Sequence, residues 1–138
     1  MAEKKNAISC ESIMKDLKAR KFAPVYVLMG DEPFYIDKIC DYIAENVLQP
    51  EERDFNQTVL FGADTTAVQV VDQCKGYPMM AEFRVVIVKE AQNLKSLDAL
   101  EKYLEKPVKS TVLVICNKNG SIDRRKKFIP RAEQVGVV

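Results

Sequence analysis

The chain has 138 residues, with 21 Lys and Arg against 20 Asp and Glu, and a formal net charge of +1. This length suits one domain of ordinary size with a sizeable core, and the near-zero charge disfavours a dedicated nucleic-acid binder, which is usually strongly basic. No apolar run is long enough to span a bilayer, and no signal-peptide pattern opens the chain. We therefore expect a cytoplasmic protein without a membrane partner.

The first half of the chain alternates between helical and extended patterns. Ser9 is placed to cap a helix over residues 9–20, and the apolar run of residues 24–29 has the length of a buried strand. The turn of residues 30–33 follows, and Pro33 suits the first position of a second helix that ends before Pro50. Alternating apolar and polar residues over 55–61 predict a strand near a sheet edge.

The second half continues the same alternation. Asp64, Thr65 or Thr66 is expected to cap a helix that runs through Cys74. The remaining predicted elements are a strand over 84–88, a helix over 94–106, a strand over 111–116, a turn over 117–120, a short basic helix, and a strand over 134–138.

Strands that are apolar on both faces and alternate with amphipathic helices predict an α/β fold, a three-layer parallel sheet with helices on both faces. We expect residues 1–138 to form a single domain. An apolar strand that stops at Val138 without a tail suggests that this domain comes from a longer protein.

The chain lacks histidine, and Cys10, Cys40, Cys74 and Cys116 are widely spaced with no CxxC pair. This spacing does not build a zinc site, and we expect no bound metal. Without histidine, the Ser-His and Cys-His catalytic arrangements are excluded. Four free and mostly buried thiols are expected.

In parallel α/β sheets nucleotides bind at the turn after the first strand. Here that turn has one glycine, two carboxylates, no phosphate-binding lysine, and Pro33, which lacks an N–H to donate. After the strand over 84–88, Lys89 stands where a hydrolase needs a metal-binding aspartate, although Glu90 resembles its catalytic glutamate. Asn117 fits either a phosphate-sensing position or an ordinary turn. The sequence predicts a nucleotide-hydrolase scaffold without its chemistry, and no cofactor.

The adjacent apolar residues Met79 and Met80 stand in a loop, after Gly76 and Pro78 and before the strand over 84–88. Loops rarely carry neighbouring apolar side chains, so either both turn into the core or at least one is a surface anchor for a partner, a role that suits the adaptable thioether. Residue type alone favours the core.

The basic stretch Arg124, Arg125, Lys126 and Lys127 has two readings. In the first, these residues contact DNA phosphates. In the second, they form the solvated face of a helix, which is the more common role of such a run of charges. Two other classes of function compete: a DNA-binding module, and a response-regulator-like α/β module. The second needs a phospho-accepting aspartate where this chain has Lys89.

Two segments resemble the delta subunit of the bacterial DNA polymerase III clamp loader. The first is residues 24–36, an apolar strand followed by Gly30, Asp31, Glu32 and Pro33 and the apolar start of a helix. The second is residues 74–88, a helix end, a loop with two adjacent hydrophobes, an arginine and an apolar strand. Relatives of the delta-prime or gamma type would show zinc-binding cysteines, which this chain lacks.

The resemblance implies a P-loop NTPase (AAA+)-like domain without a functional phosphate loop, the N-terminal domain of a delta subunit whose lid and collar domains are absent. It implies binding to the sliding clamp (the beta subunit) through Met79 and Met80, with Tyr77, Pro78 and Phe83 as flanking contacts, and at least Met80 as an anchor. Binding would help to open the ring during DNA replication.

The same resemblance implies no catalysis by this chain itself, within the DNA polymerase III holoenzyme, a nucleotidyltransferase complex. ATP would be hydrolysed by other clamp-loader subunits. The implied partners are the sliding clamp, the delta-prime and gamma/tau subunits, and DNA in the full complex.

Overall fold

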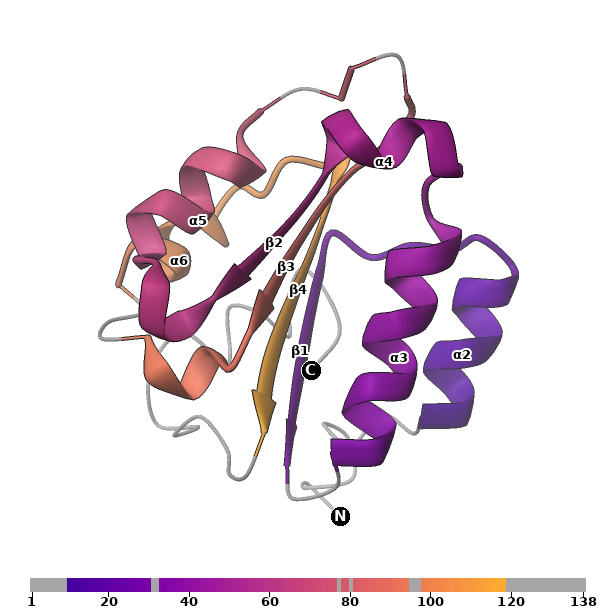
Figure 1. The fold of residues 1–138 in the computed structure, drawn as a ribbon, viewed down its shortest axis with the longest axis horizontal. Coiled ribbons are helices and arrows are strands. Elements are labelled where there is room, and N and C mark those ends of the chain that lie inside the picture. The colour runs from indigo at the N-terminus through magenta and orange to yellow at the C-terminus, as the bar shows by residue number, and fades with distance from the viewer. Residues whose placement is uncertain (1–9, 31–32, 77, 80, 95–97, 119–138) are drawn as a thin grey trace.

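The computed structural model describes residues 10–30, 33–76, 78–79, 81–94 and 98–118. These residues form a parallel sheet with helices on both faces, so the predicted three-layer α/β architecture is confirmed (Figure 1). The strand order across the sheet is β1-β4-β3-β2, and every neighbouring pair is parallel. The strands are β1 (Val25–Gly30), β2 (Gln57–Phe61), β3 (Arg84–Lys89) and β4 (Thr111–Lys118).

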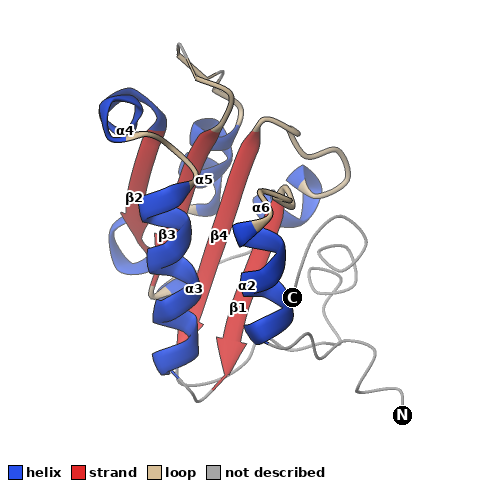
Figure 2. Ribbon diagram, turned by 90° about the vertical axis from the view of Figure 1, so that its right-hand side faces the viewer, coloured by secondary structure: helices blue, strands red, loops and turns tan. Residues whose placement is uncertain are grey.

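The two central strands are buried on both faces, which explains their unbroken apolar sequences. Side chains that alternate along each strand enter separate cores, so that Val86 and Leu113 face one side while Val85 and Val112 face the other. Helices α2 (Cys10–Lys18) and α3 (Pro33–Asn46) cover one face, and α5 (Ala67–Cys74) and α6 (Asp98–Tyr103) cover the other (Figure 2). Each fully buried side chain contributes roughly 1.5–3 kcal/mol.

Strand β2 lies at the edge of the sheet, as predicted. Its beginning differs from the prediction, however. A short helix, α4 (Pro50–Asn56), precedes it, so Phe55 and Asn56 belong to a helix and the expectation of a strand from residue 55 is wrong. Residues 49–52 explain why a helix forms here. Pro50 occupies the first turn, and the Glu52 carboxylate accepts a hydrogen bond from the Gln49 N–H at 2.8 Å.

Three other boundaries need correction. Helix α2 ends at Lys18 rather than at residue 20, where Arg20 adopts a left-handed φ of 59°. The helix expected over 94–106 is too long, because Ala91–Asn93 forms a 3-10 turn that closes at Leu94, and α6 ends at Tyr103. Its inward residues Leu100 and Leu104 are buried as expected.

The turn expected over 117–120 is wrong at its start, because Asn117 and Lys118 continue β4. They pair with residues 29 and 30 of β1, so the ladder between these strands extends beyond the apolar run. Thr66 caps α5, one of three candidates that the sequence left open: its hydroxyl accepts a hydrogen bond from the Gln69 N–H at 3.2 Å. Ser9 and the elements expected after residue 118 lie outside the described residues.

Cys40, Cys74 and Cys116 are buried and form no disulfide, as expected for these three cysteines. Among the residues that the structure describes, no helix has the length and apolarity to cross a membrane.

Candidate partner-binding site

The loop that carries Met79 lies at the amino-terminal edge of the sheet. It connects the end of α5 to the start of β3 at Arg84, and α4 leads into β2 at the same edge (Figure 1). The turn after β1, where a nucleotide would bind in this kind of sheet, lies at the opposite, carboxyl-terminal edge. We call residues 76–83 the apolar loop. Any binding that it performs is therefore separate from the nucleotide position of the fold.

The backbone of the apolar loop is held by Asn56, the last residue of α4. This side chain is fully buried. Its Oδ1 accepts a hydrogen bond from the Met79 N–H at 2.6 Å, and its Nδ2 donates to the Met79 carbonyl at 2.9 Å. The Nδ2 group also donates to the Glu52 carbonyl at 3.0 Å, inside α4. The amide thus pairs with Met79 as a neighbouring strand would, and joins the loop to the helix.

Arg84 holds the loop from its other end. Its Nε donates to the Gln73 carbonyl at 2.8 Å and one Nη donates to Gln73 Oε1 at 2.8 Å, while the other Nη reaches the Phe55 carbonyl at 3.4 Å. The guanidinium thereby satisfies a carbonyl at the C-terminus of α5, where a positive charge is favourable, and links α5 to α4.

Gly76 gives the guanidinium its space. A Cβ at this position would lie 3.1 Å from Arg84 Nε and 3.2 Å from its Cζ, tighter than an ordinary contact. The buried Thr111 hydroxyl adds a further tie, since it donates to the Cys74 carbonyl at 2.7 Å. The end of α5 is therefore fixed to β3 and β4 before the loop begins.

The Met79 side chain projects from this fixed backbone into solvent, with 59% of its surface exposed. It does not turn into the core, which decides the question that residue type left open for this methionine. Pro78 is half-buried. Met80 and Tyr77, which the sequence also proposes as contacts, lie outside the described residues.

Phe83 lies at the base of the apolar loop and is half-buried. Its ring packs edge-on against Phe22, with the ring centroids 5.3 Å apart and the planes at 88°. It also packs against the core on the α2 and α3 side of the sheet. Phe83 therefore attaches the end of the loop to the core, and part of the Phe83 side chain stays accessible to solvent.

Phe55 is a candidate that the sequence did not suggest. It precedes Asn56 in α4 and is 66% exposed. The prediction of a strand over 55–61 hid both residues, because it assigned them to alternate faces of a sheet. A helix start at Pro50 with Glu52 in its first turn was the signal that could have revealed them.

At the carboxyl-terminal edge, the described residues lack the acidic pair of a nucleotide hydrolase. Lys89 ends β3 and Glu90 is exposed, with a left-handed φ of 54°. A Cβ on Gly62 would lie 2.2 Å from the Glu90 carbonyl, so the backbone is closely packed there. Within the described part of the chain, no cluster of three acidic, cysteine or histidine side chains is placed to hold a metal ion.

Burial and hydrogen bonding shift the pKa values of two buried thiols in opposite directions. Burial raises the pKa of the Cys74 thiol to about 12, partly offset by a hydrogen bond with Tyr103. Burial likewise raises the pKa of the Tyr103 hydroxyl to about 12. A hydrogen bond with Cys116 lowers the pKa of Cys40, whose side chain is buried. The basic stretch at residues 124–127 lies outside the described residues.

Comparison with known proteins shows the family of the chain. Residues 26–138 match the family model for the DNA polymerase III delta subunit. DNA polymerase III subunit delta of Bacillus subtilis (strain 168) is 30% identical, over 84% of this chain and 36% of that protein. The DNA clamp loader delta protein of Bacillus subtilis has a similar structure, with a TM-score of 0.83 and 26% identity over 94% of this chain and 41% of that one.

A DNA polymerase III gamma subunit-related protein of Thermotoga maritima matches with a TM-score of 0.52 and 14% identity, over 91% of this chain and 45% of that one. At this identity the likeness shows the fold alone, an α/β fold built on a parallel sheet. The chain thus spans less than half the length of each of these relatives.

Proposed function

The chain belongs to the DNA polymerase III delta-subunit family, a component of the DNA polymerase III holoenzyme, and from this premise we propose that it binds the ring-shaped sliding clamp through Met79 and Met80. Binding helps to open the ring during DNA replication, and this chain hydrolyses no ATP. Its partners in this role are the clamp and the delta-prime and gamma/tau subunits of the clamp loader. Residues 1–138 act as one ATPase-like domain.

One observation carries the proposal: an exposed methionine stands on a backbone that buried polar groups hold in place. Met79 is 59% exposed, whereas Asn56, which bonds its N–H and carbonyl, is fully buried. A mobile apolar side chain loses conformational entropy when it binds, and a fixed backbone reduces that loss. The arrangement suits an anchor that enters an apolar pocket.

The energy available from such an anchor is sufficient for recognition. Burial of one methionine side chain contributes roughly 1.5–3 kcal/mol, which corresponds to about a tenfold or larger change in affinity. Two adjacent methionines give the loop the apolar area that the hot spot of an interface needs.

Ring opening follows if the loop binds one state of the clamp more tightly than another. A ligand shifts an equilibrium only by its differential affinity for the two states. Because Asn56 holds the backbone of Met79 in place, a strained or open clamp interface that fits Met79 better becomes more populated. The basic residues Arg124, Arg125, Lys126 and Lys127 are not part of this proposed surface, and a DNA contact by them is a separate proposal.

The test is surface plasmon resonance against the sliding clamp of the same organism, with the unchanged protein and a Met79→Ala/Met80→Ala variant. We expect the double substitution to lower the affinity at least tenfold, with an unchanged circular dichroism spectrum. The matched control is Val68→Ala, which truncates an equally exposed apolar side chain (59%) on α5. Clamp binding that is indifferent to the double substitution would place the contact elsewhere.

A further inference from the structure

Phe55 is an exposed large apolar side chain on α4, the helix whose last residue, Asn56, bonds Met79. It is 66% exposed near the C-terminus of α4, at the amino-terminal edge of the sheet. Scattered exposed apolar residues need no explanation, but adjacent ones often mark an interaction surface. The exposure of Phe55 indicates an interaction surface because hydrogen bonds connect the end of α4 to Met79.

Two sets of hydrogen bonds connect the end of α4, where Phe55 lies, to the apolar loop and to the start of β3. The neighbouring residue, Asn56, bonds the backbone of Met79, and the Phe55 carbonyl accepts a hydrogen bond from Arg84 at 3.4 Å. Both ties involve backbone atoms, so they fix where the two side chains emerge without restraining the side chains themselves. Phe55 and Met79 are therefore presented on one rigid unit.

Charged residues precede Phe55 in α4. The preceding residues of α4 are Glu51, Glu52, Arg53 and Asp54, all polar or charged. Apolar anchors enclosed by polar residues are typical of the centre of a protein–protein interface, where the surrounding contacts exclude water. The other exposed apolar pair on this part of the chain, Val59 and Phe61 on β2, shows no such tie to the loop among the described contacts.

We propose that Phe55 is a second anchor for the sliding clamp, which binds the same apolar surface as Met79. This inference rests on the proposed function and extends it from one loop to a composite surface formed by α4 and the apolar loop. When two side chains on one rigid domain bind the same partner, translational and rotational freedom is lost only once. The free energy gained from burial of the second side chain therefore adds to the affinity.

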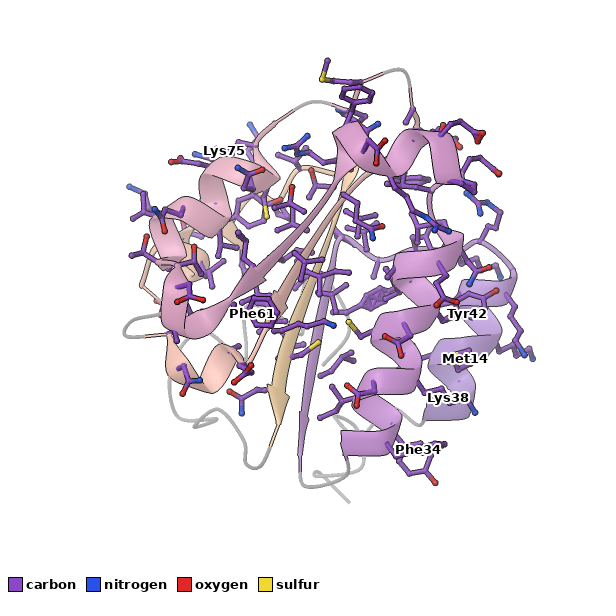
Figure 3. The ribbon with its side chains drawn as sticks, viewed as in Figure 1. Met14, Phe34, Lys38, Tyr42, Phe61 and Lys75 are labelled. Atoms are coloured by element: carbon purple, nitrogen blue, oxygen red, sulfur yellow. The ribbon has the colours of Figure 1, made fainter. Side chains whose placement is uncertain are left out.

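The experiment measures clamp affinity for Phe55→Ala beside Met79→Ala/Met80→Ala. We expect Phe55→Ala to lower the affinity about tenfold, as truncation of an interface anchor does. Phe55→Leu keeps most of the apolar area and should restore most of the loss. The matched control is Phe34→Ala, since Phe34 is also 66% exposed but lies at the start of α3, at the opposite edge of the sheet (Figure 3).

The outcomes separate the inference from the proposed function. If the methionine variant loses affinity and Phe55→Ala does not, Phe55 is no anchor and the clamp-binding function stands. If Phe34→Ala loses as much as Phe55→Ala, the effect is not local and the inference fails as well. If the unchanged, folded protein does not bind the clamp at all, the proposed function and the inference are both overturned.

Discussion

The side-chain amide of Asn56 forms two hydrogen bonds with the backbone of Met79, at 2.6 and 2.9 Å. These residues are 23 positions apart in the chain, one in the last turn of a helix and one in a loop. The pair satisfies both polar groups of a buried amide and both backbone groups of an exposed residue. It therefore couples the stability of the fold to the position of the proposed anchor.

Replacement of Asn56 tests this coupling. Asn56→Ala leaves the Met79 N–H and carbonyl without their partner, and we expect a loss of about 1–3 kcal/mol in the free energy of unfolding, measured by urea denaturation. Clamp affinity should fall too, because the loop loses its preorganised position. Asn56→Asp keeps an acceptor for the Met79 N–H but cannot donate to the Met79 carbonyl, so its effect should persist.

The control for this prediction is Asn46→Ala. Asn46 Nδ2 also donates to a backbone carbonyl, that of Tyr42 at 2.9 Å, but in an exposed position at the end of α3. Its loss should cost much less, because water replaces the partner. Equal destabilisation by the two substitutions would contradict the special role of Asn56.

Arg84 should not be replaceable by lysine. Arg84→Lys keeps the charge but cannot reproduce the fork that bonds Gln73 twice and reaches the Phe55 carbonyl. We expect a loss of roughly 1–3 kcal/mol in the free energy of unfolding, again from urea denaturation, and a weaker hold on the apolar loop. Lys75→Ala removes an exposed positive charge at the end of α5 (Figure 3) and should change stability by less than about 0.5 kcal/mol. A fully stable Arg84→Lys variant would show that charge alone suffices.

Stability should fall in alkaline solution because of Cys74. Its pKa is raised in the folded state from 9.0 to about 12, so between these values the unfolded chain has lost a proton that the native protein keeps. The free energy of unfolding then decreases as the pH rises through this window, by up to about 1.4 kcal/mol per pH unit for one group. Tyr103, raised from 10.0 to about 12, adds a decrease of the same sign above pH 10.

The measurement is urea denaturation at intervals between pH 8 and 10, for the unchanged protein and for Cys74→Ala. The variant should be less stable at pH 8, because it leaves a small cavity in the core, but its stability should decline less steeply with pH. Cys40, whose pKa is lowered, contributes with the opposite sign in both proteins and cancels in the comparison. Parallel pH profiles would mean that Cys74 does not titrate differently in the two states.

Much of the fold could be predicted because its signals are local. Runs such as Val85, Val86, Ile87 and Val88 are apolar on both faces, and only a central parallel strand buries both. Errors occurred at element ends, where short-range hydrogen bonds compete with the pattern: Phe55 and Asn56 end α4 instead of beginning β2, and β4 continues through Asn117 because β1 pairs with it.

The sequence by itself determined the class of the fold, the order of its elements and the unusual pair of methionines in a loop, because period and residue type are properties of neighbouring positions. Only the tertiary structure decided that Met79 faces solvent, that Asn56 holds its backbone, and that Phe55 is exposed on the same helix as Asn56. These relations join residues from α4 and the loop before β3, and such residues meet only when β2 and β3 pair in register. Pairing of that kind depends on the packing of the whole sheet, which no local stretch of sequence encodes.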